Sequence, residues 1–175
     1  MPYAVAHVIL TIVTADIYRD YIAKKKFPMI YVFVAGIAGL MPDLDIPAGW
    51  VFNFIFGTHY NFHRIYTHSL SYAIGFFFIA MLFLASSREK YKIFRWNVPK
   101  RAFFMFFLAI AFGWFMHIGL DCALAADGYL NLIPSVPLKF CPSPFSNQAL
   151  VGFDAIILVL WLIHEQWKHK IRDYF

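Results

Sequence analysis

Residues 63–85 read HRIYTHSLSYAIGFFFIAMLFLA, a short polar turn that runs directly into a nearly unbroken apolar segment. The turn, His63–Ser69, holds two imidazoles, a guanidinium and three hydroxyls. On a continuous helix, histidines five residues apart would point about 140° away from each other, whereas in an irregular turn they can converge. The apolar segment Leu70–Ala85 predicts a helix that Thr67 or Ser69 caps. Two histidines at the start of an apolar helix suggest a metal site at a membrane surface.

The composition of the 175-residue chain is that of an integral membrane protein. Hydrophobic residues make up 61%, charged residues only 14%, and the mean hydropathy is +0.62, far from the balance of a soluble domain. The 21 Phe and five Trp residues are too many for a soluble core of this size to bury. The length predicts a single domain over residues 1–175. The two cysteines form no CxxC motif, which argues against a zinc ribbon or a thioredoxin-like site.

Five apolar segments predict the membrane-embedded helices. They cover about residues 2–17, 27–41, 70–85, 102–120 and 149–163. A straight membrane span needs about 20 residues, so the first, second and fifth segments are marginal unless polar ends extend them. We expect an all-α polytopic membrane bundle with about five transmembrane or partly inserted helices.

The basic residues indicate how the chain lies across the membrane. Thirteen of the 15 Lys and Arg residues lie after the first, third and fifth segments, and only Arg64 and Lys139 lie in the other loops. Under the positive-inside rule, the N-terminus is outside and the C-terminus is cytoplasmic in the cell membrane. The net charge of +5 therefore reflects topology, and we expect no binding of nucleic acid.

Histidines and aspartates gather on the predicted outer side. His117 and Asp121 are one helical turn apart on one face, and His7 forms a polar stripe with Thr11 and Thr14 in an apolar helix. Polar residues within a span normally face the bundle interior and mark a site. A topology based only on Lys and Arg brings eight residues to this side: His7, Asp43, Asp45, His63, His68, His117, Asp121 and Asp154. We predict that they converge.

Several of these residues also have simpler interpretations. A lone histidine in a span often serves as a hydrogen-bond partner between helices, so His7 alone does not indicate a metal. Paired aspartates often stabilise a turn. His59 would share a face with His63 only if a helical turn formed there. His164 and His169 lie near the basic C-terminal tail and are expected to be solvated.

The order of these motifs resembles a known family. The chain has His7 in the first helix, then MPDLDIP, HRIYTHS, and HIGLD before a loop rich in Gly and Pro. Over about residues 4–145 this order resembles the membrane-bound metal-dependent hydrolases of the inner membrane, which are similar in their metal-site motifs to zinc-dependent phospholipase C and zinc-dependent single-strand nucleases. The resemblance implies six metal-site residues: His7, Asp43, His63, His68, His117 and Asp121. Asp154 matches an acidic position of the last helix. The chain departs from the pattern at Ile65, where members often have Gly, and at Ile46, where many have His.

Mixed histidine and carboxylate ligands favour Zn²⁺, with Mn²⁺ or Fe²⁺ as alternatives. Eight candidates exceed the three or four ligands of one zinc ion, so we expect two ions. The expected reaction is hydrolysis by metal-activated water at the outer membrane interface, with a phosphoester of a phospholipid or other amphiphile as substrate. Arg64 would clamp the phosphate, and Asp43, Asp45 or Asp154 would act as general base.

Membrane lipids are the expected partners. The alternative functions are an ion or metal transporter and a structural metal site that joins short helices.

Cys122 and Cys141 both lie in the predicted outer loop. They can form a disulfide if that compartment is oxidising, and two unpaired thiols are the equally open alternative.

Overall fold

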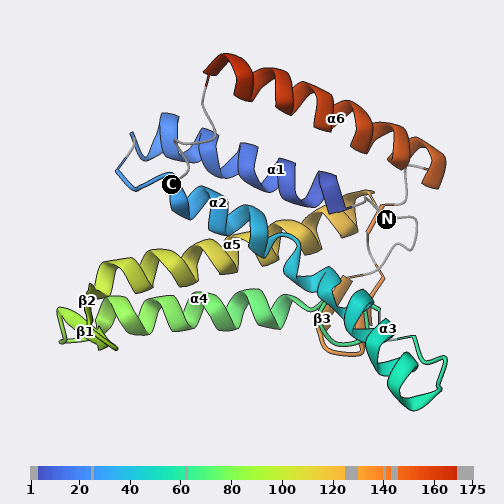
Figure 1. Cartoon of the computed structure of the whole chain (residues 1–175), viewed down its shortest axis with the longest axis horizontal. Coiled ribbons are helices and arrows are strands. Elements are labelled where there is room, and N and C mark those ends of the chain that lie inside the picture. The colour runs from blue at the N-terminus through green and yellow to red at the C-terminus, as the bar shows by residue number, and fades with distance from the viewer. Residues whose placement is uncertain are drawn as a thin grey trace.

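The computed structural model is mostly helical (Figure 1). It describes residues 4–24, 26–61, 63–124, 130–139, 141–142 and 146–168. The helices are α1 (Ala4–Ile17), extended by a π-helical turn (Tyr18–Ile22), α2 (Ile30–Ala38), a 3-10 turn (Met41–Leu44), α3 (Asp45–Phe56), α4 (Leu70–Ala85), α5 (Lys100–Leu124) and α6 (Asn147–Lys168). Two antiparallel hairpins pair β1 (Lys90–Ile93) with β2 (Trp96–Pro99) and β3 (Leu130–Ile133) with β4 (Val136–Leu138).

Each of the five predicted segments contains a helix, and α4 has the predicted bounds. Ser69 caps α4 as expected, because its hydroxyl accepts a hydrogen bond from the backbone N–H of Ser71. The all-α prediction is incomplete, since it missed both hairpins and also α3, which lies in a stretch predicted to be a loop. Pro47 in that stretch does not break α3, because it occupies the first helical turn, where the backbone N–H needs no partner inside the helix.

Two or three of the predicted membrane spans have support in the helix lengths, and five spans are not shown. Within the described residues, α5 and α6 are long and apolar enough to cross a membrane. The pair formed by α2 and Met41–Phe56 is bent by 47° and adds a third candidate if it is one broken span. α1 and α4 are shorter than a straight span requires. Length and composition therefore support two or three spans, where the sequence predicted about five.

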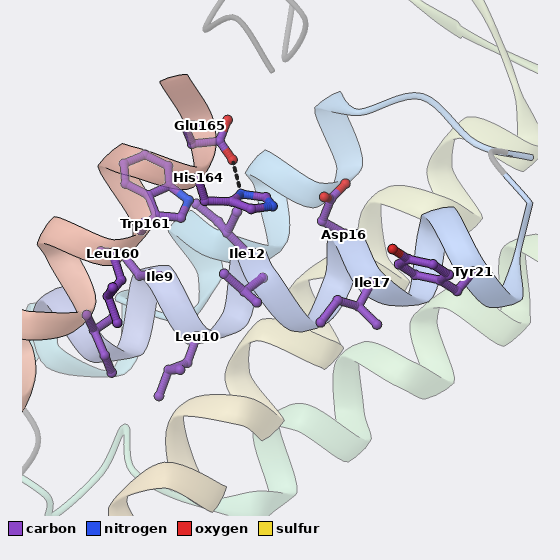
Figure 2. A pocket seen from close by; sticks show the side chains of 12 residues that line it. Ile9, Leu10, Ile12, Asp16, Ile17, Tyr21, Leu160, Trp161, His164 and Glu165 are labelled. Atoms are coloured by element: carbon purple, nitrogen blue, oxygen red, sulfur yellow. Dashed lines mark ion pairs between the residues drawn. The ribbon is translucent and has the colours of Figure 1, made fainter. Parts of the chain in front are cut away.

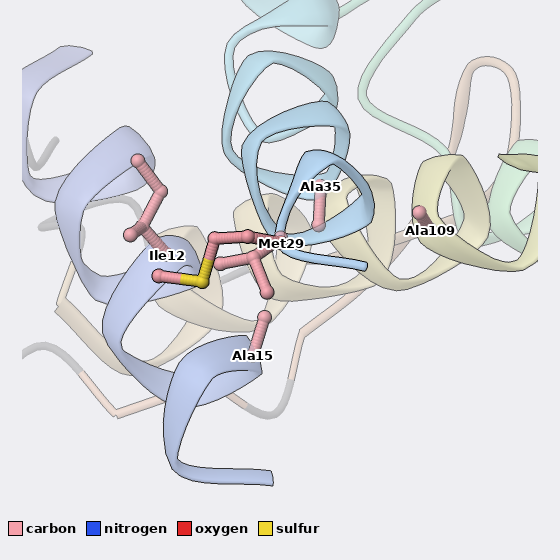
Figure 3. Packing of buried hydrophobic residues seen from close by; sticks show 6 residues of the cluster. Ile12, Ala15, Met29, Ala35 and Ala109 are labelled. Carbon is pink, nitrogen blue, oxygen red and sulfur yellow. The ribbon is translucent and has the colours of Figure 1, made fainter. Parts of the chain in front are cut away.

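The centre of the bundle is packed with small side chains. Ile12 and Ala15 of α1 meet Ala35 of α2, Ala109 of α5, and Met29, which precedes α2 (Figure 3). A second cluster joins α2, α4 and α5. Small residues at helix contacts let backbones come close together, which is how helices associate where lipid removes the hydrophobic driving force. This close packing brings α1, α2 and α5 together at the end of the bundle that carries the histidines.

α6 packs along α1 at the side of the bundle and leaves a cavity of about 470 Å³ between the two helices (Figure 2). Its walls are mostly apolar, and Asp16 and Glu165 are buried at its polar end. His164 was predicted to be solvated. Its ring is about half exposed, and its Nδ1 lies 3.5 Å from the carboxylate of Glu165. His169 lies outside the described residues.

The two cysteines form a disulfide, with their Cα atoms 5.0 Å apart. Of the two alternatives, a disulfide or two unpaired thiols, the structure contains the disulfide. The disulfide joins the last turn of α5, one residue beyond Asp121, to the segment that follows the β3–β4 hairpin.

Thiol labelling tests this disulfide. Denatured, unreduced protein should incorporate no label, and two thiols should react after reduction. Replacing both cysteines with Ala should lower the free energy of unfolding by about 3 kcal/mol, as expected for a closed loop of this size. Labelling of two thiols before reduction would contradict the bridge.

Candidate metal centre

The turn His63–Ser69 is built around the carboxylate of Asp45, the first residue of α3. Asp45 Oδ2 accepts hydrogen bonds from the backbone N–H of Arg64 at 3.0 Å and from the hydroxyl of Thr67 at 2.8 Å. Asp45 Oδ1 lies 3.0 Å from Nδ1 of His63. Arg64 has a φ of 65°, a left-handed backbone conformation that residues other than glycine rarely adopt. One carboxylate therefore fixes the shape of the whole turn.

Five side chains from four parts of the chain meet beside this turn, and we call them the ligand cluster: His7, Asp43, His68, His117 and Asp121. His68 Nε2 lies 3.2 Å from Asp43 Oδ1 and 3.7 Å from Asp121 Oδ2. His117 Nε2 lies 3.7 Å from each of these two oxygens. His7 Nε2 lies 3.4 Å from Asp121 Oδ1. Asp121 thus faces His7 with one oxygen and the other two histidines with its second oxygen.

Hydrogen bonds outside the ligand cluster orient its histidines. His117 Nδ1 lies 2.7 Å from the carbonyl oxygen of Gly39, so this nitrogen donates and the lone pair of Nε2 faces the cluster. Metal-binding histidines are usually oriented in this way. The His7 ring stacks on the His117 ring with centroids 3.8 Å apart.

His68 bridges the ligand cluster and the turn. Its Nδ1 lies 3.3 Å from Asp45 Oδ2, while its Nε2 faces the cluster. Burial alone would lower the pKa of His68, but hydrogen bonds to Asp43 and Asp45 and the charge of Asp121 outweigh it and raise the pKa to about 9. The three carboxylates therefore create a site that attracts positive charge.

Three buried atoms of the ligand cluster have no hydrogen-bond partner among the described residues. They are His7 Nδ1, His117 Nε2 and Asp121 Oδ1. Buried polar atoms are normally hydrogen-bonded, so three in one cluster require an explanation. His7, His117 and Asp121 form a group whose potential ligand atoms, one from each residue, all lie within 4.8 Å of one another, close enough to hold one ion. A metal ion held by this group would provide a partner for His117 Nε2 and Asp121 Oδ1.

Glycines bring the helices of the ligand cluster together. A methyl group at Gly113 of α5 would overlap the carbonyl oxygen of Ala35 in α2, and it would lie 2.8 Å from the backbone nitrogen of Gly39. At Gly39 it would lie 3.0 Å from the carbonyl oxygen of His7. The lack of a side chain at Gly113 leaves room one helical turn before His117. The structure shows that this room is filled by the α2 backbone, which supplies the carbonyl that orients His117.

Arg64 points its guanidinium at Asp121, with Nη2 3.2 Å from Oδ2, and is only 7% exposed. The sequence predicted that Arg64 clamps a substrate phosphate. In the structure its guanidinium already has an anionic partner within the protein, the carboxylate of Asp121.

Two other residues hold the turn and were missed in the sequence analysis. The Asn131 side chain donates to the carbonyl of Arg64 at 2.8 Å, and Trp114 donates to the carbonyl of Thr67 at 3.0 Å. Of these two, only Trp114 could have been found from the sequence, because it lies one helical turn before His117 and therefore on the same side of α5.

Seven of the eight predicted residues belong to three groups of potential metal ligands. These are His7, His117 and Asp121; Asp43, His68 and His117; and Asp45, His63 and His68. Asp154 is buried on α6 and belongs to none of the three groups. His59 is exposed, and it lines a cavity of about 250 Å³ together with Asp45 and His63. Asp127 lies outside the described residues.

A family model described as YdjM inner membrane protein matches residues 1–172. The chain belongs to the YdjM inner membrane protein family. Membership agrees with the apolar helices and supports a membrane protein. No curated protein and no solved structure matches the chain. For this YdjM family member, the chemistry of the site must therefore be argued from its own residues.

The substitution Gly113→Ala tests the close contact between α2 and α5. The added methyl group meets backbone atoms, so we expect a loss of about 1–3 kcal/mol in unfolding free energy together with a lower metal content. Thermal unfolding in detergent and elemental analysis measure the two effects.

Gly119→Ala is the matched control on the same helix. Gly119 is exposed, and no atom lies within 4 Å of the added methyl group, so the variant should be at least as stable as the wild type. Equal behaviour of the two variants would show that the contact at Gly113 does not matter.

Proposed function

We propose that this protein is a metal-dependent hydrolase whose site lies at the outer membrane interface and that it cleaves a phosphoester of a lipid or another amphiphile. The observation that carries the proposal is the ligand cluster. Its imidazole nitrogens and carboxylate oxygens converge within a few ångströms, and two of the potential ligand atoms are buried without a hydrogen-bond partner among the described residues. An arrangement of this kind is costly in a buried site unless a cation balances it.

The donor set fits Zn²⁺ best, with Mn²⁺ or Fe²⁺ as alternatives, because imidazole and carboxylate ligands suit these ions. The cluster supplies five side chains, more than one tetrahedral zinc ion uses. Asp121 directs its two oxygens toward different histidines, so this carboxylate would help to hold the two ions. A bound zinc ion supplies Lewis acidity, which activates water and polarises a phosphoryl oxygen.

The outer location is supported by the distribution of charged residues along the chain. The ligand cluster lies where α1 begins and α5 ends, whereas the basic stretches lie where α1 ends, where α4 connects to α5, and near the end of α6. The positive-inside rule assigns the basic end to the cytoplasm. α3 starts at Asp45 and exposes Trp50 and Phe54 by 71% and 89%, as expected for a helix in contact with lipid. These features favour an amphiphilic substrate.

The roles of turn support, proton acceptor and phosphate contact fall to three residues near the ligand cluster. Asp45 already faces four donor groups, so we assign it to holding the turn and orienting His68, and not to proton transfer. Asp43 is the more exposed of the two carboxylates next to His68, with 16% of its side chain accessible against 6% for Asp45. We therefore propose that it accepts the proton of the attacking water. Arg64 orients Asp121 and contributes positive charge toward the substrate phosphate.

Metal content tests the ligand cluster directly. Purified protein should contain two zinc ions, and His68→Ala or His117→Ala should each lose most of the metal and all phosphoester turnover while still inserting into the membrane. His59→Ala is the matched control, because this histidine is exposed on the same side. Full metal occupancy in the His68 and His117 variants would rule out the site.

Substrate assays separate the proposed function from its alternatives. Turnover on phosphodiesters, phosphomonoesters and acyl esters should be metal-dependent and greatest on a phosphoester. A protein that retains tightly bound metal but hydrolyses none of these would have a structural metal site that joins α1, α5 and the turn. Metal transport by reconstituted vesicles without hydrolysis would favour a transporter.

Arg64→Lys tests the role of the guanidinium. Lysine keeps the charge but loses the planar pair of donors, so the variant should retain metal and lower kcat/KM on a phosphoester by about 10- to 100-fold, as expected for one lost charge-assisted hydrogen bond. Joint loss of metal and folding would make Arg64 purely structural. Full turnover with metal retained would exclude a contact with the phosphate.

A further inference from the structure

A second cavity, of about 300 Å³, lies beside the ligand cluster, between the turn His63–Ser69 and the β3–β4 hairpin. The hairpin is fixed against the turn by backbone and side-chain contacts. Ser135 donates its backbone N–H to the carbonyl of Ile65 at 3.1 Å, and the Ser69 hydroxyl donates to the carbonyl of Leu132 at 3.1 Å. The disulfide ties the segment after the hairpin to α5. The walls of this cavity are therefore held in place from both sides.

The cavity holds the only two basic residues of the sequence outside the three basic stretches. Arg64 and Lys139 both line it, together with the polar residues Asn131 and Ser135. The other 13 Lys and Arg residues belong to the three basic stretches of the sequence. Among the described residues, none forms an ion pair with Lys139. Its ammonium group is therefore available to an anion in the cavity.

The surroundings of the cavity are apolar. Ile65 and Pro137 form part of its wall. The hairpin also exposes a set of large hydrophobic side chains to the outside: Leu132, Ile133, Val136 and Leu138. The hairpin lies at the same end of the bundle as α3, whose own apolar residues are exposed (Figure 1). A ligand of this cavity would meet two cations inside and hydrocarbon around the entrance.

We propose that this cavity binds the phosphate group of an anionic amphiphile, with Lys139 and Arg64 as its cationic contacts and the exposed hairpin side chains against its alkyl part. A volume of 300 Å³ is at the lower end for ligand sites, which suits a headgroup and not a whole lipid. Arg64 contacts both Asp121 and this cavity, so a phosphate held here lies next to the ligand cluster. In this respect the inference rests on the proposed function and names the substrate class of the same site.

Titration calorimetry in a non-ionic detergent tests the proposal on the protein as purified. The probes are hexylphosphonate, whose carbon–phosphorus bond resists hydrolysis, inorganic phosphate, and hexyltrimethylammonium. We expect hexylphosphonate to bind more tightly than inorganic phosphate, and the ammonium compound not to bind. Lys139→Ala should weaken hexylphosphonate binding about tenfold, the effect of one lost charge-assisted hydrogen bond. Lys139→Arg should restore most of the affinity.

Lys92→Ala is the matched control, because Lys92 is an exposed lysine in the β1–β2 hairpin at the opposite end of the bundle. It should bind hexylphosphonate like the wild type. Unchanged binding in Lys139→Ala would overturn the cavity as an anion site. Equal affinity for inorganic phosphate and hexylphosphonate would overturn the amphiphile and indicate free phosphate as the ligand.

Metal analysis and turnover, measured on the same samples, separate this inference from the proposed function. If the protein lacks metal or turnover but hexylphosphonate binding depends on Lys139, the cavity stands and the hydrolase fails. If metal and phosphoester turnover are present but binding and KM are the same in Lys139→Ala and the wild type, the hydrolase stands and the cavity fails.

Discussion

The close approach of α2 and α5 at Gly113 is the contact on which the candidate metal centre depends. It brings the carbonyl of Gly39 to within 2.7 Å of His117 Nδ1, which sets the direction of that ring. The same part of α2 presses against His7 of α1, whose ring stacks on His117. Three helices are thus brought together by the absence of side chains, in the way that helices associate in lipid. A larger residue at this contact would separate the ligands without changing any of them.

A second constraint is the balance of charge in a protein that is otherwise mostly hydrocarbon. Asp45 and Asp121 are almost fully buried, and Asp43 is partly buried, in a region where an uncompensated carboxylate is very unfavourable. Asp45 is stabilised by the donors of the turn, and Asp121 by Arg64. The cluster still has unsatisfied atoms after these contacts. These buried atoms without a partner among the described residues, more than the presence of histidines, favour a bound cation.

The two ends of the bundle have opposite chemistry, and this difference links the site to the membrane. One end carries most of the lysines and arginines. The other end carries the carboxylates and histidines, the apolar helix α3 and the β3–β4 hairpin. A cavity lined by Arg64 and Lys139 lies between that hairpin and the turn. A substrate with a charged head and an alkyl tail would find complementary surfaces for both parts only at this second end.

The sequence by itself determined the membrane class, the approximate positions of five helices, and seven of the eight histidines and aspartates predicted to meet. These follow from composition, apolar length and the positions of Lys and Arg, which are properties of segments and require no knowledge of packing. It did not reveal α3 or the hairpins, because a short apolar stretch with a proline and strands of three or four residues have weak local signals. Only the tertiary structure decided that Asp45 holds the turn, that Arg64 faces Asp121, that Asp154 stays outside the three ligand groups, and that Lys139 shares a cavity with Arg64. These relations join residues far apart in the sequence, such as Arg64 and Asp121, which are 57 positions apart. They depend on how closely two helix backbones approach, which no local pattern of residues encodes.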